Sequence, residues 1–92
     1  MGTARQNIEI TNQRGLHARA SAKFVAAVAK LPAGTMVKVA KDGVEALGSS
    51  ILGLMMLGAA RGDTIEIIVT GEDAEALCTK LVGLVMDGFG ED

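Results

Sequence analysis

The chain has 92 residues, enough for one small domain with a modest hydrophobic core. Its net charge of −2 and pI of about 5.3 argue against a protein that binds nucleic acid through a basic surface. No apolar run approaches the roughly 20 residues that a membrane-spanning helix needs, and the N-terminus lacks the apolar segment of a signal peptide. The single cysteine, Cys78, cannot form an internal disulfide, so we expect a cytoplasmic protein.

The first third of the chain contains a strand pattern followed by a helix pattern. Residues 7–10 alternate polar and apolar side chains, which predicts a short half-buried strand. A polar, turn-like stretch follows over 11–15. The apolar period then changes to i, i+4 and i+7, which predicts an amphipathic helix over 18–30 that ends before a proline and a glycine. The residues of this apolar stripe are Phe24, Val28 and Leu31.

The middle of the chain predicts a hairpin and a second helix. Alternation over 37–40 indicates a strand, and Asp42-Gly43 is a strong signal for a two-residue hairpin turn. Residues 44–47 are then the returning strand. Ser49-Ser50 supplies N-cap residues for a short helix over 51–57, which a glycine ends.

The last third predicts one more strand and one more helix. Residues 64–70 show the clearest alternation in the chain. Acidic residues at 72–75 suit the N-terminus of a final helix, whose inner stripe ends near Gly88. The order β-α-β-β-α-β-α with short connections favours an α+β fold, a four-stranded antiparallel sheet with three helices on one face. We expect a single domain over 1–92, ordered over about 6–87, with a frayed tail over 88–92.

The only histidine, His17, lies where the strand pattern gives way to the first helix pattern. A helix N-terminus offers unpaired N–H groups and the positive end of the helix dipole, which together favour a bound anion. A neutral imidazole is nucleophilic near pH 7, and the guanidinium of Arg19 can pair with the same anion. Arg14 and Lys23 add positive charge nearby. These residues predict a histidine that accepts a phosphoryl group; the alternative is a histidine that only caps the helix or lies on the surface.

Other chemistries find little support in the sequence. No serine, cysteine or carboxylate stands beside His17 in a way that would make it the base of a catalytic triad. The chain has no further histidine for a metal site, and no glycine-rich phosphate loop joins a strand to a helix. We therefore expect neither a metal nor a cofactor.

The second predicted helix is apolar on every side. Full burial is the simplest interpretation, but a two-layer domain of this size covers only one face of a short helix. Some of its side chains should therefore reach solvent, and a methionine-rich apolar patch suits docking to several partners. The candidates are Ile51, Leu52, Met55 and Met56.

Two motifs, Gly15-Leu16-His17-Ala18-Arg19 and Ser50-Ile51-Leu52-Gly53-Leu54-Met55-Met56-Leu57-Gly58, resemble those of HPr, the histidine-containing phosphocarrier family of the bacterial phosphotransferase system. The resemblance covers nearly the whole chain and implies an open-faced β-sandwich. It also implies that His17 is phosphorylated through Nδ1 and that Arg19 is the active-site arginine. By the same resemblance, Ser50 is a regulatory serine, and the apolar docking surface consists of Ile51, Leu52 and Met55.

The resemblance implies a monomeric carrier with no turnover of its own. Enzyme I would supply the phosphoryl group from phosphoenolpyruvate, EIIA proteins or domains would receive it, and an HPr kinase/phosphorylase is a candidate partner at Ser50. The family usually has proline after the arginine, where this chain has Ala20, so we expect a looser first turn. The resemblance does not decide whether the chain serves the sugar-transport branch of the phosphotransferase system or its nitrogen-type regulatory branch.

Two other functions compete with phosphoryl transfer. The first is a regulatory HPr-like protein that works only by binding, under the control of Ser50 phosphorylation. Regulatory members of that kind typically lack the histidine, which this chain retains at position 17. The second is a small-molecule sensor domain, which needs a concave pocket with convergent polar groups. The sequence offers no candidate for such a pocket outside the His17 corner.

Overall fold

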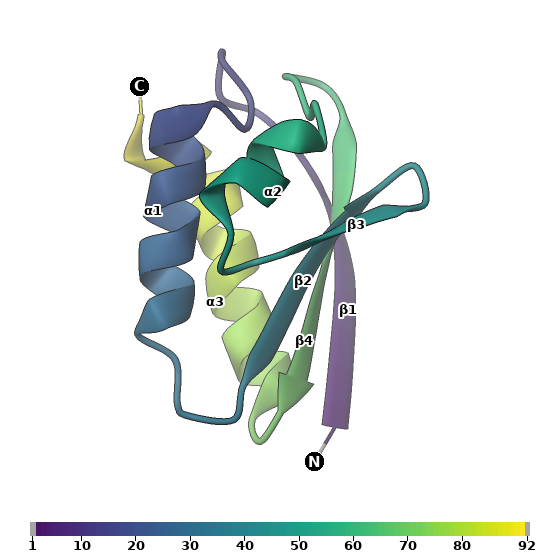
Figure 1. Cartoon of the computed structure of the whole chain (residues 1–92), viewed down its shortest axis with the longest axis vertical. Helices are drawn as coiled ribbons and strands as arrows, with labels where there is room; N and C mark the ends of the chain where they lie inside the picture. The colour runs from purple at the N-terminus through teal and green to yellow at the C-terminus, as the bar shows by residue number, and fades with distance from the viewer. Residues whose placement is uncertain (1, 92) are drawn as a thin grey trace.

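An antiparallel sheet covered by helices on one face forms the frame of the molecule (Figure 1). The structure is a computed structural model and describes residues 2–91. The strands are β1 (Gly2–Glu9), β2 (Met36–Lys41), β3 (Val44–Leu47) and β4 (Thr64–Gly71), and they lie in the order β1-β4-β2-β3. The helices are α1 (Ala18–Ala29), α2 (Ile51–Met56), α3 (Ala74–Met86) and a short 3-10 helix, η1 (Gly88–Gly90). The predicted fold class, an open-faced β-sandwich in the order β-α-β-β-α-β-α, is confirmed.

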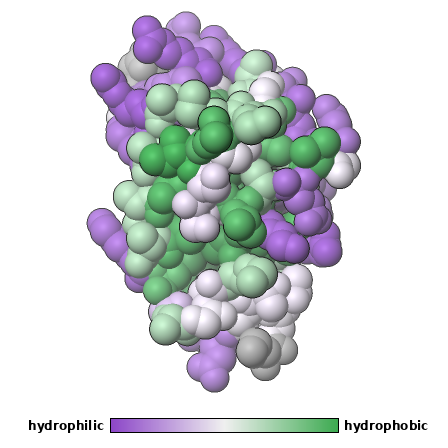
Figure 2. Space-filling view, viewed as in Figure 1, coloured by the Kyte–Doolittle hydropathy of each residue, from purple (hydrophilic) through white to green (hydrophobic). Residues whose placement is uncertain are grey.

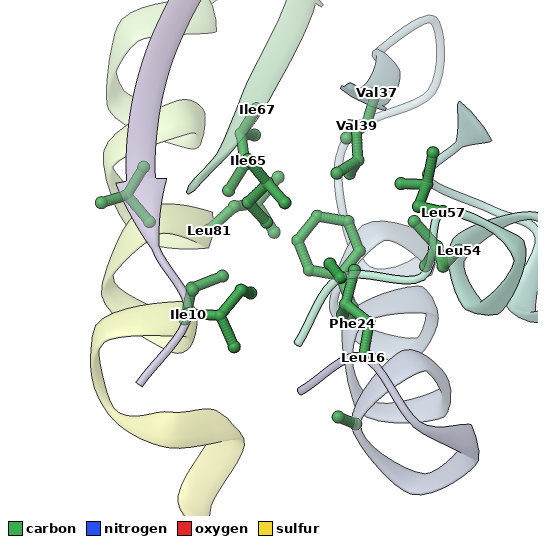
Figure 3. Packing of buried hydrophobic residues seen from close by; sticks show 14 of the residues in the cluster. Ile10, Leu16, Phe24, Val37, Val39, Leu54, Leu57, Ile65, Ile67 and Leu81 are labelled. Carbon is green, nitrogen blue, oxygen red and sulfur yellow. The ribbon is translucent and has the colours of Figure 1, made fainter. Parts of the chain in front are cut away.

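The hydrophobic core lies between the inner face of the sheet and the helices (Figure 3). Every second side chain of β4 points into it, because strand side chains alternate between the two faces. These core residues of β4, at most 1% exposed, are Ile65, Ile67 and Val69. Phe24 from α1 and Leu81 from α3 pack against them and are also about 1% exposed. Burying one such side chain contributes roughly 1.5–3 kcal/mol, so these few residues stabilise much of the fold.

The hairpin between β2 and β3 forms where the sequence predicts it. Asp42 and Gly43 have φ angles of +52° and +82°, the left-handed conformation that a two-residue hairpin turn of this kind requires at both positions. The flanking residues Lys41 and Val44 face each other in the register of the two strands. Local turn chemistry therefore decides the connection at this edge of the sheet.

The first strand is longer than its apolar alternation indicates. β1 begins at Gly2, although the sequence favours order only from about residue 6. Its early residues are mostly exposed and show no apolar pattern. They are ordered instead by backbone pairing with β4, where Gly2 lies opposite Gly71 and Glu9 lies opposite Thr64.

The structure also differs from the prediction of a frayed tail over 88–92, as far as residue 91; Asp92 lies outside the described residues. Gly88–Gly90 forms η1, and Phe89 is only 1% exposed in the core. Phe89 adopts a left-handed φ of +59°, which costs a residue with a side chain about 1–2 kcal/mol. Burial of the ring, worth roughly 1.5–3 kcal/mol, offsets this cost. The tail folds back because the ring of Phe89 is buried in the core. The composition of the tail alone did not indicate this burial.

Candidate functional site

A tight turn fixes the entry into α1. Gly15 has a φ of +62°, in the left-handed region that favours glycine. A Cβ atom at this position would collide with the carbonyl oxygen of Ala59 and lie 2.8 Å from the Cα of Ala60. The next residue, Leu16, is buried and donates its N–H to the same Ala59 carbonyl at 2.9 Å. The turn therefore sets the position of His17 against the loop that precedes β4.

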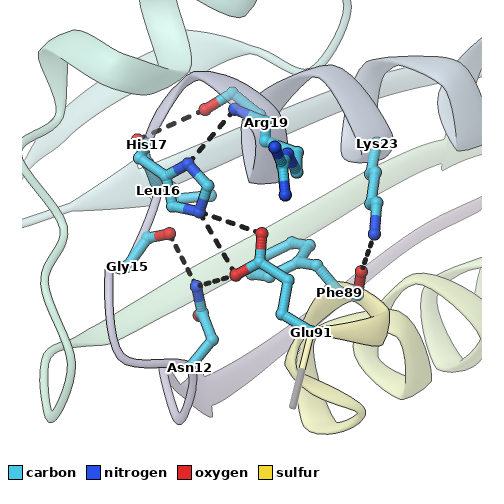
Figure 4. Close-up of polar contacts among 9 residues, drawn as sticks. Asn12, Gly15, Leu16, His17, Arg19, Lys23, Phe89 and Glu91 are labelled. Carbon is cyan, nitrogen blue, oxygen red and sulfur yellow. Dashed lines mark hydrogen bonds and ion pairs between the residues drawn. The ribbon is translucent and has the colours of Figure 1, made fainter.

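His17 is the N-cap of α1, and its ring contacts both the helix and the C-terminal tail (Figure 4). Nδ1 accepts a hydrogen bond from the backbone N–H of Arg19 at 3.2 Å. Nε2 lies 3.2 Å from Oε1 and 3.0 Å from Oε2 of Glu91. An amide N–H only donates and a carboxylate only accepts, so these contacts place the proton on Nε2. The neutral ring then holds its lone pair on Nδ1, at the N-terminus of a helix.

Two residues that the sequence patterns did not single out complete the site: Glu91 contacts Nε2, and Asn12 holds Glu91. Asn12 is buried, and its amide donates to the carbonyl oxygen of Gly15 at 2.9 Å and to Oε1 of Glu91 at 3.2 Å. The hydrogen bond from His17 holds the pKa of the Glu91 carboxyl below its usual range; Asn12 and the positive charge of Lys23 act in the same direction, and burial opposes them.

Local signals for these two residues are weak or absent. Asn12 precedes Gly15 in a turn-like stretch, and asparagine is common in turns, so a turn role was the only available signal. Glu91 is 74 positions away from His17 in the sequence, and no periodicity connects positions so far apart. Only the folded tail brings its carboxylate to the ring.

An open depression of about 510 Å³ lies beside the ring. Its lining residues are Gln13, Arg14, His17, Arg19 and Glu91. The two guanidinium groups are exposed and can form paired hydrogen bonds with a tetrahedral anion. Lys23, which the sequence placed near the site, has another role: its Nζ donates to the carbonyl oxygen of Phe89 at 2.9 Å and holds the tail. The arrangement combines a nucleophilic nitrogen with groups that stabilise negative charge.

The exposed part of α2 forms an apolar surface beside α1 (Figures 1 and 2). Leu54 points inward and is fully buried, which anchors this short helix. The α2 patch, as we name it, consists of four side chains that are 40–76% exposed: Ile51, Leu52, Met55 and Met56. Although this surface is apolar, no helix in the described part of the chain is long and apolar enough to cross a membrane. The prediction that part of this helix reaches solvent is confirmed.

Ser50 begins the same helix. Its hydroxyl accepts a hydrogen bond from the backbone N–H of Gly53 at 3.0 Å, so its predicted N-cap role is confirmed. The side chain is partly exposed and stands directly before the α2 patch. A charge added at Ser50 would therefore change an apolar surface at its edge.

Comparison with known families decides the identity of this arrangement. A family model described as "PTS HPr component phosphorylation site" matches residues 4–87, which is most of the chain. The chain belongs to the HPr family. Members of this family are phosphocarriers of the bacterial phosphotransferase system rather than catalysts, and the family resemblance drawn from the two sequence motifs is confirmed.

Individual HPr relatives match nearly end to end. "Phosphocarrier protein HPr" of Neisseria meningitidis serogroup A is 42% identical over 87 residues, 95% of this chain and 96% of the relative. "Phosphocarrier protein NPr" of Escherichia coli K12 is 34% identical over 90 residues, 98% of this chain and 99% of the relative.

Solved structures agree with this fold. The crystal structure of HPr from Thermoanaerobacter tengcongensis superposes with a TM-score of 0.88 at 36% identity, covering 97% of this chain and 98% of that one. Crh, the catabolite repression protein of Bacillus subtilis described as a domain-swapped dimer, superposes with a TM-score of 0.72 at 32% identity and covers 90% and 93% of the two chains. The fold is thus shared with a protein that is named for catabolite repression.

Proposed function

We propose that His17 accepts a phosphoryl group on Nδ1 from Enzyme I and passes it to an EIIA protein or domain. The observation that carries this proposal is the hydrogen-bonding pattern of the ring, which leaves the lone pair on Nδ1 at the start of α1. The two arginines of the depression, Arg14 and Arg19, add positive charge where the phosphoryl oxygens would lie.

The proposed transfer step exchanges one hydrogen bond at the start of α1. The Nδ1 lone pair forms the bond to phosphorus while the bond between phosphorus and the donor's leaving atom breaks, and its electron pair stays with the donor. Nδ1 gives up the hydrogen bond from the Arg19 N–H, and this N–H becomes available to a phosphoryl oxygen. The helix N-terminus thus exchanges a nitrogen acceptor for an anionic oxygen, which it binds more strongly.

Direct labelling tests the proposed function. The purified chain is incubated with phosphoenolpyruvate and Enzyme I, and its intact mass is measured. We expect the mass of one added phosphoryl group, lost in acid and retained in base as for a phosphoramidate. A chain that keeps its unmodified mass while a known HPr in the same reaction is labelled would contradict the proposal.

Arg19→Ala should slow phosphoryl transfer more than it weakens binding to Enzyme I. A guanidinium in the depression acts on charge that develops during transfer, so we expect a roughly 10- to 100-fold lower transfer rate with binding changed less than about threefold. Rapid-quench kinetics and titration calorimetry measure the two quantities. The control is Arg5→Ala, which removes the same charge on β1, where Arg5 pairs with Glu66 at 3.3 Å. Equal losses in rate and affinity would make Arg19 a docking residue instead.

We also propose that the α2 patch docks Enzyme I, and Met55→Glu tests this. Met55 is 40% exposed, so a carboxylate there should leave the stability within about 1 kcal/mol of the parent. Binding should weaken by about tenfold or more, because a charge would enter an apolar interface. Met86→Glu is the matched control, since Met86 is 64% exposed on α3. If both variants bind equally well, the docking surface lies elsewhere.

A regulatory role for Ser50 is a second candidate function, favoured by its place before the α2 patch and by the Crh-like neighbour. We expect Ser50→Asp to fold normally, because aspartate is also a good N-cap. Its charge at the edge of the patch should slow phosphoryl uptake by about tenfold. Ser50→Asn caps the helix without the charge and should behave as the parent does. Uptake by Ser50→Asp at the parental rate would leave Ser50 with its capping role alone.

A further inference from the structure

We propose that Glu91 is a positioning residue for His17: its carboxylate keeps a proton on Nε2 while the phosphoryl group occupies Nδ1. The inference rests on the proposed function, because it assumes that His17 is the acceptor. It assigns a role in the chemistry to a tail that the sequence predicts to be frayed.

The Glu91 carboxylate is held by several anchors rather than by the ring alone. Asn12 donates to Oε1 at 3.2 Å and is itself fixed by Gly15. The buried ring of Phe89 and the Lys23 hydrogen bond to its carbonyl hold the backbone just before Glu91 (Figure 4). The side chains of His17 and Glu91 are only 22% and 15% exposed, so the contact is partly shielded from water. Such anchoring lets a carboxylate act at a fixed position.

The proton on Nε2 matters because it determines whether the imidazole ring is a good leaving group when the phosphoryl group is passed on. When Nδ1 attacks phosphorus, its lone pair becomes the N–P bond, and the ring, which retains Nε2–H, carries a positive charge. When an acceptor attacks the same phosphorus, the N–P electron pair returns to Nδ1 and a neutral imidazole leaves. Without the Nε2 proton, the leaving group would be an imidazolate anion, which departs far less readily. A carboxylate beside Nε2 favours the cationic ring by charge attraction.

The other charged groups around the ring oppose such a cation. Arg14 and Arg19 line the same depression, and Lys23 lies close enough to act on Glu91. Glu91 is the acidic residue among those that line the depression in the described part of the chain. Its single negative charge therefore offsets part of the positive charge of Arg14, Arg19 and Lys23 at the point where the ring itself becomes charged.

The experiment follows loss of the phosphoryl group from the phosphorylated full-length chain as a function of pH. The variants are Glu91→Gln, which keeps the shape without the charge, Glu91→Asp, which keeps the charge, and Glu72→Gln, which removes an exposed carboxylate elsewhere. For Glu91→Gln we expect the ring to lose its Nε2 proton at lower pH, so that phosphoryl loss at neutral pH is about 3- to 10-fold slower. Glu91→Asp should recover part of the parental rate, and Glu72→Gln should match it.

A spectroscopic measurement separates this role from a structural one. Long-range ¹H–¹⁵N spectra of the phosphorylated ring should show Nε2–H persisting to higher pH in the parent than in Glu91→Gln. Amide exchange at Gly90 and Glu91, whose N–H groups bond to Asp87 and Gly88, reports whether the tail stays docked. The proposal would be overturned if the pH profiles of the Nε2–H signal and of phosphoryl loss coincide for the parent and Glu91→Gln while the tail stays docked. Equal slowing of phosphoryl loss in Glu91→Gln and Glu91→Asp would also overturn it. If the parent itself takes up no phosphoryl group, it is the proposed function that fails.

Discussion

Replacing His17 with alanine should abolish phosphoryl uptake and leave the fold intact. The depression beside α1 is otherwise lined by amide, guanidinium and carboxylate groups, and of these side chains only the imidazole combines a free lone pair with a helix N-terminus. Loss of a nucleophile typically lowers a rate by several orders of magnitude, so we expect a drop of at least about 10⁴-fold. Loss of the N-cap hydrogen bond should cost about 0.5–2 kcal/mol of stability. Intact mass after reaction with Enzyme I and urea unfolding measure the two effects.

A second variant separates the two contributions of His17. Asparagine is a strong N-cap residue but offers no imidazole nitrogen, so His17→Asn should keep the parental stability and still accept no phosphoryl group. Labelling of either variant at the parental level would show that the phosphoryl group resides on another residue. Mapping of that residue by mass spectrometry would then replace the assignment of His17.

Gly15→Ala should have the second largest effect, although Gly15 contributes no side chain to the site. The substitution combines a left-handed φ of +62° with a collision against the backbone at Ala59. The conformational cost of about 1–2 kcal/mol and an overpacking cost of about 1–3 kcal/mol together predict a loss of roughly 2–5 kcal/mol in the free energy of unfolding. Because the turn positions the N-cap, we also expect slower phosphoryl uptake in the fraction that remains folded.

The control for this variant is another glycine with a positive φ. Gly34 has a φ of +89° and open space around its Cα, so Gly34→Ala should cost only the conformational part, about 1 kcal/mol. Equilibrium unfolding in urea compares the two. Equal losses at Gly15 and Gly34 would show that the contact with Ala59 relaxes at no cost, and the turn would then be less rigid than its geometry indicates.

Most of the fold was predictable because its signals are local. The alternation of Ile65, Ile67 and Val69 follows from a strand with one buried face, and Asp42-Gly43 carries the dihedral preference of its own turn. The second helix could be recognised as partly exposed, because a two-layer domain cannot cover an apolar helix on every side. In each case a short stretch of sequence contains the physical cause of the structure.

The candidate site was only half predictable, for the opposite reason. His17 and Arg19 stand together in one motif at a helix start, so their proximity is a matter of local sequence. Glu91 reaches the ring through a tertiary contact, and the preceding Phe89 adopts a backbone conformation that its residue type disfavours. Only burial in the assembled core stabilises that conformation, and a core is a property of the whole chain.

The docked tail also determines how the molecule should be handled. The two ends of the described chain lie far apart: β1 begins at one extremity, and Glu91 ends beside α1 at the other (Figure 1). A purification tag or surface linker joined directly to Glu91 would begin next to His17 and obstruct incoming proteins there. The same tag placed before Gly2 would emerge at the distal end of the sheet. Binding assays should therefore immobilise the chain through its N-terminal end. A comparison of the affinities measured with N-terminal and C-terminal immobilisation would show how much free space a partner needs around the imidazole.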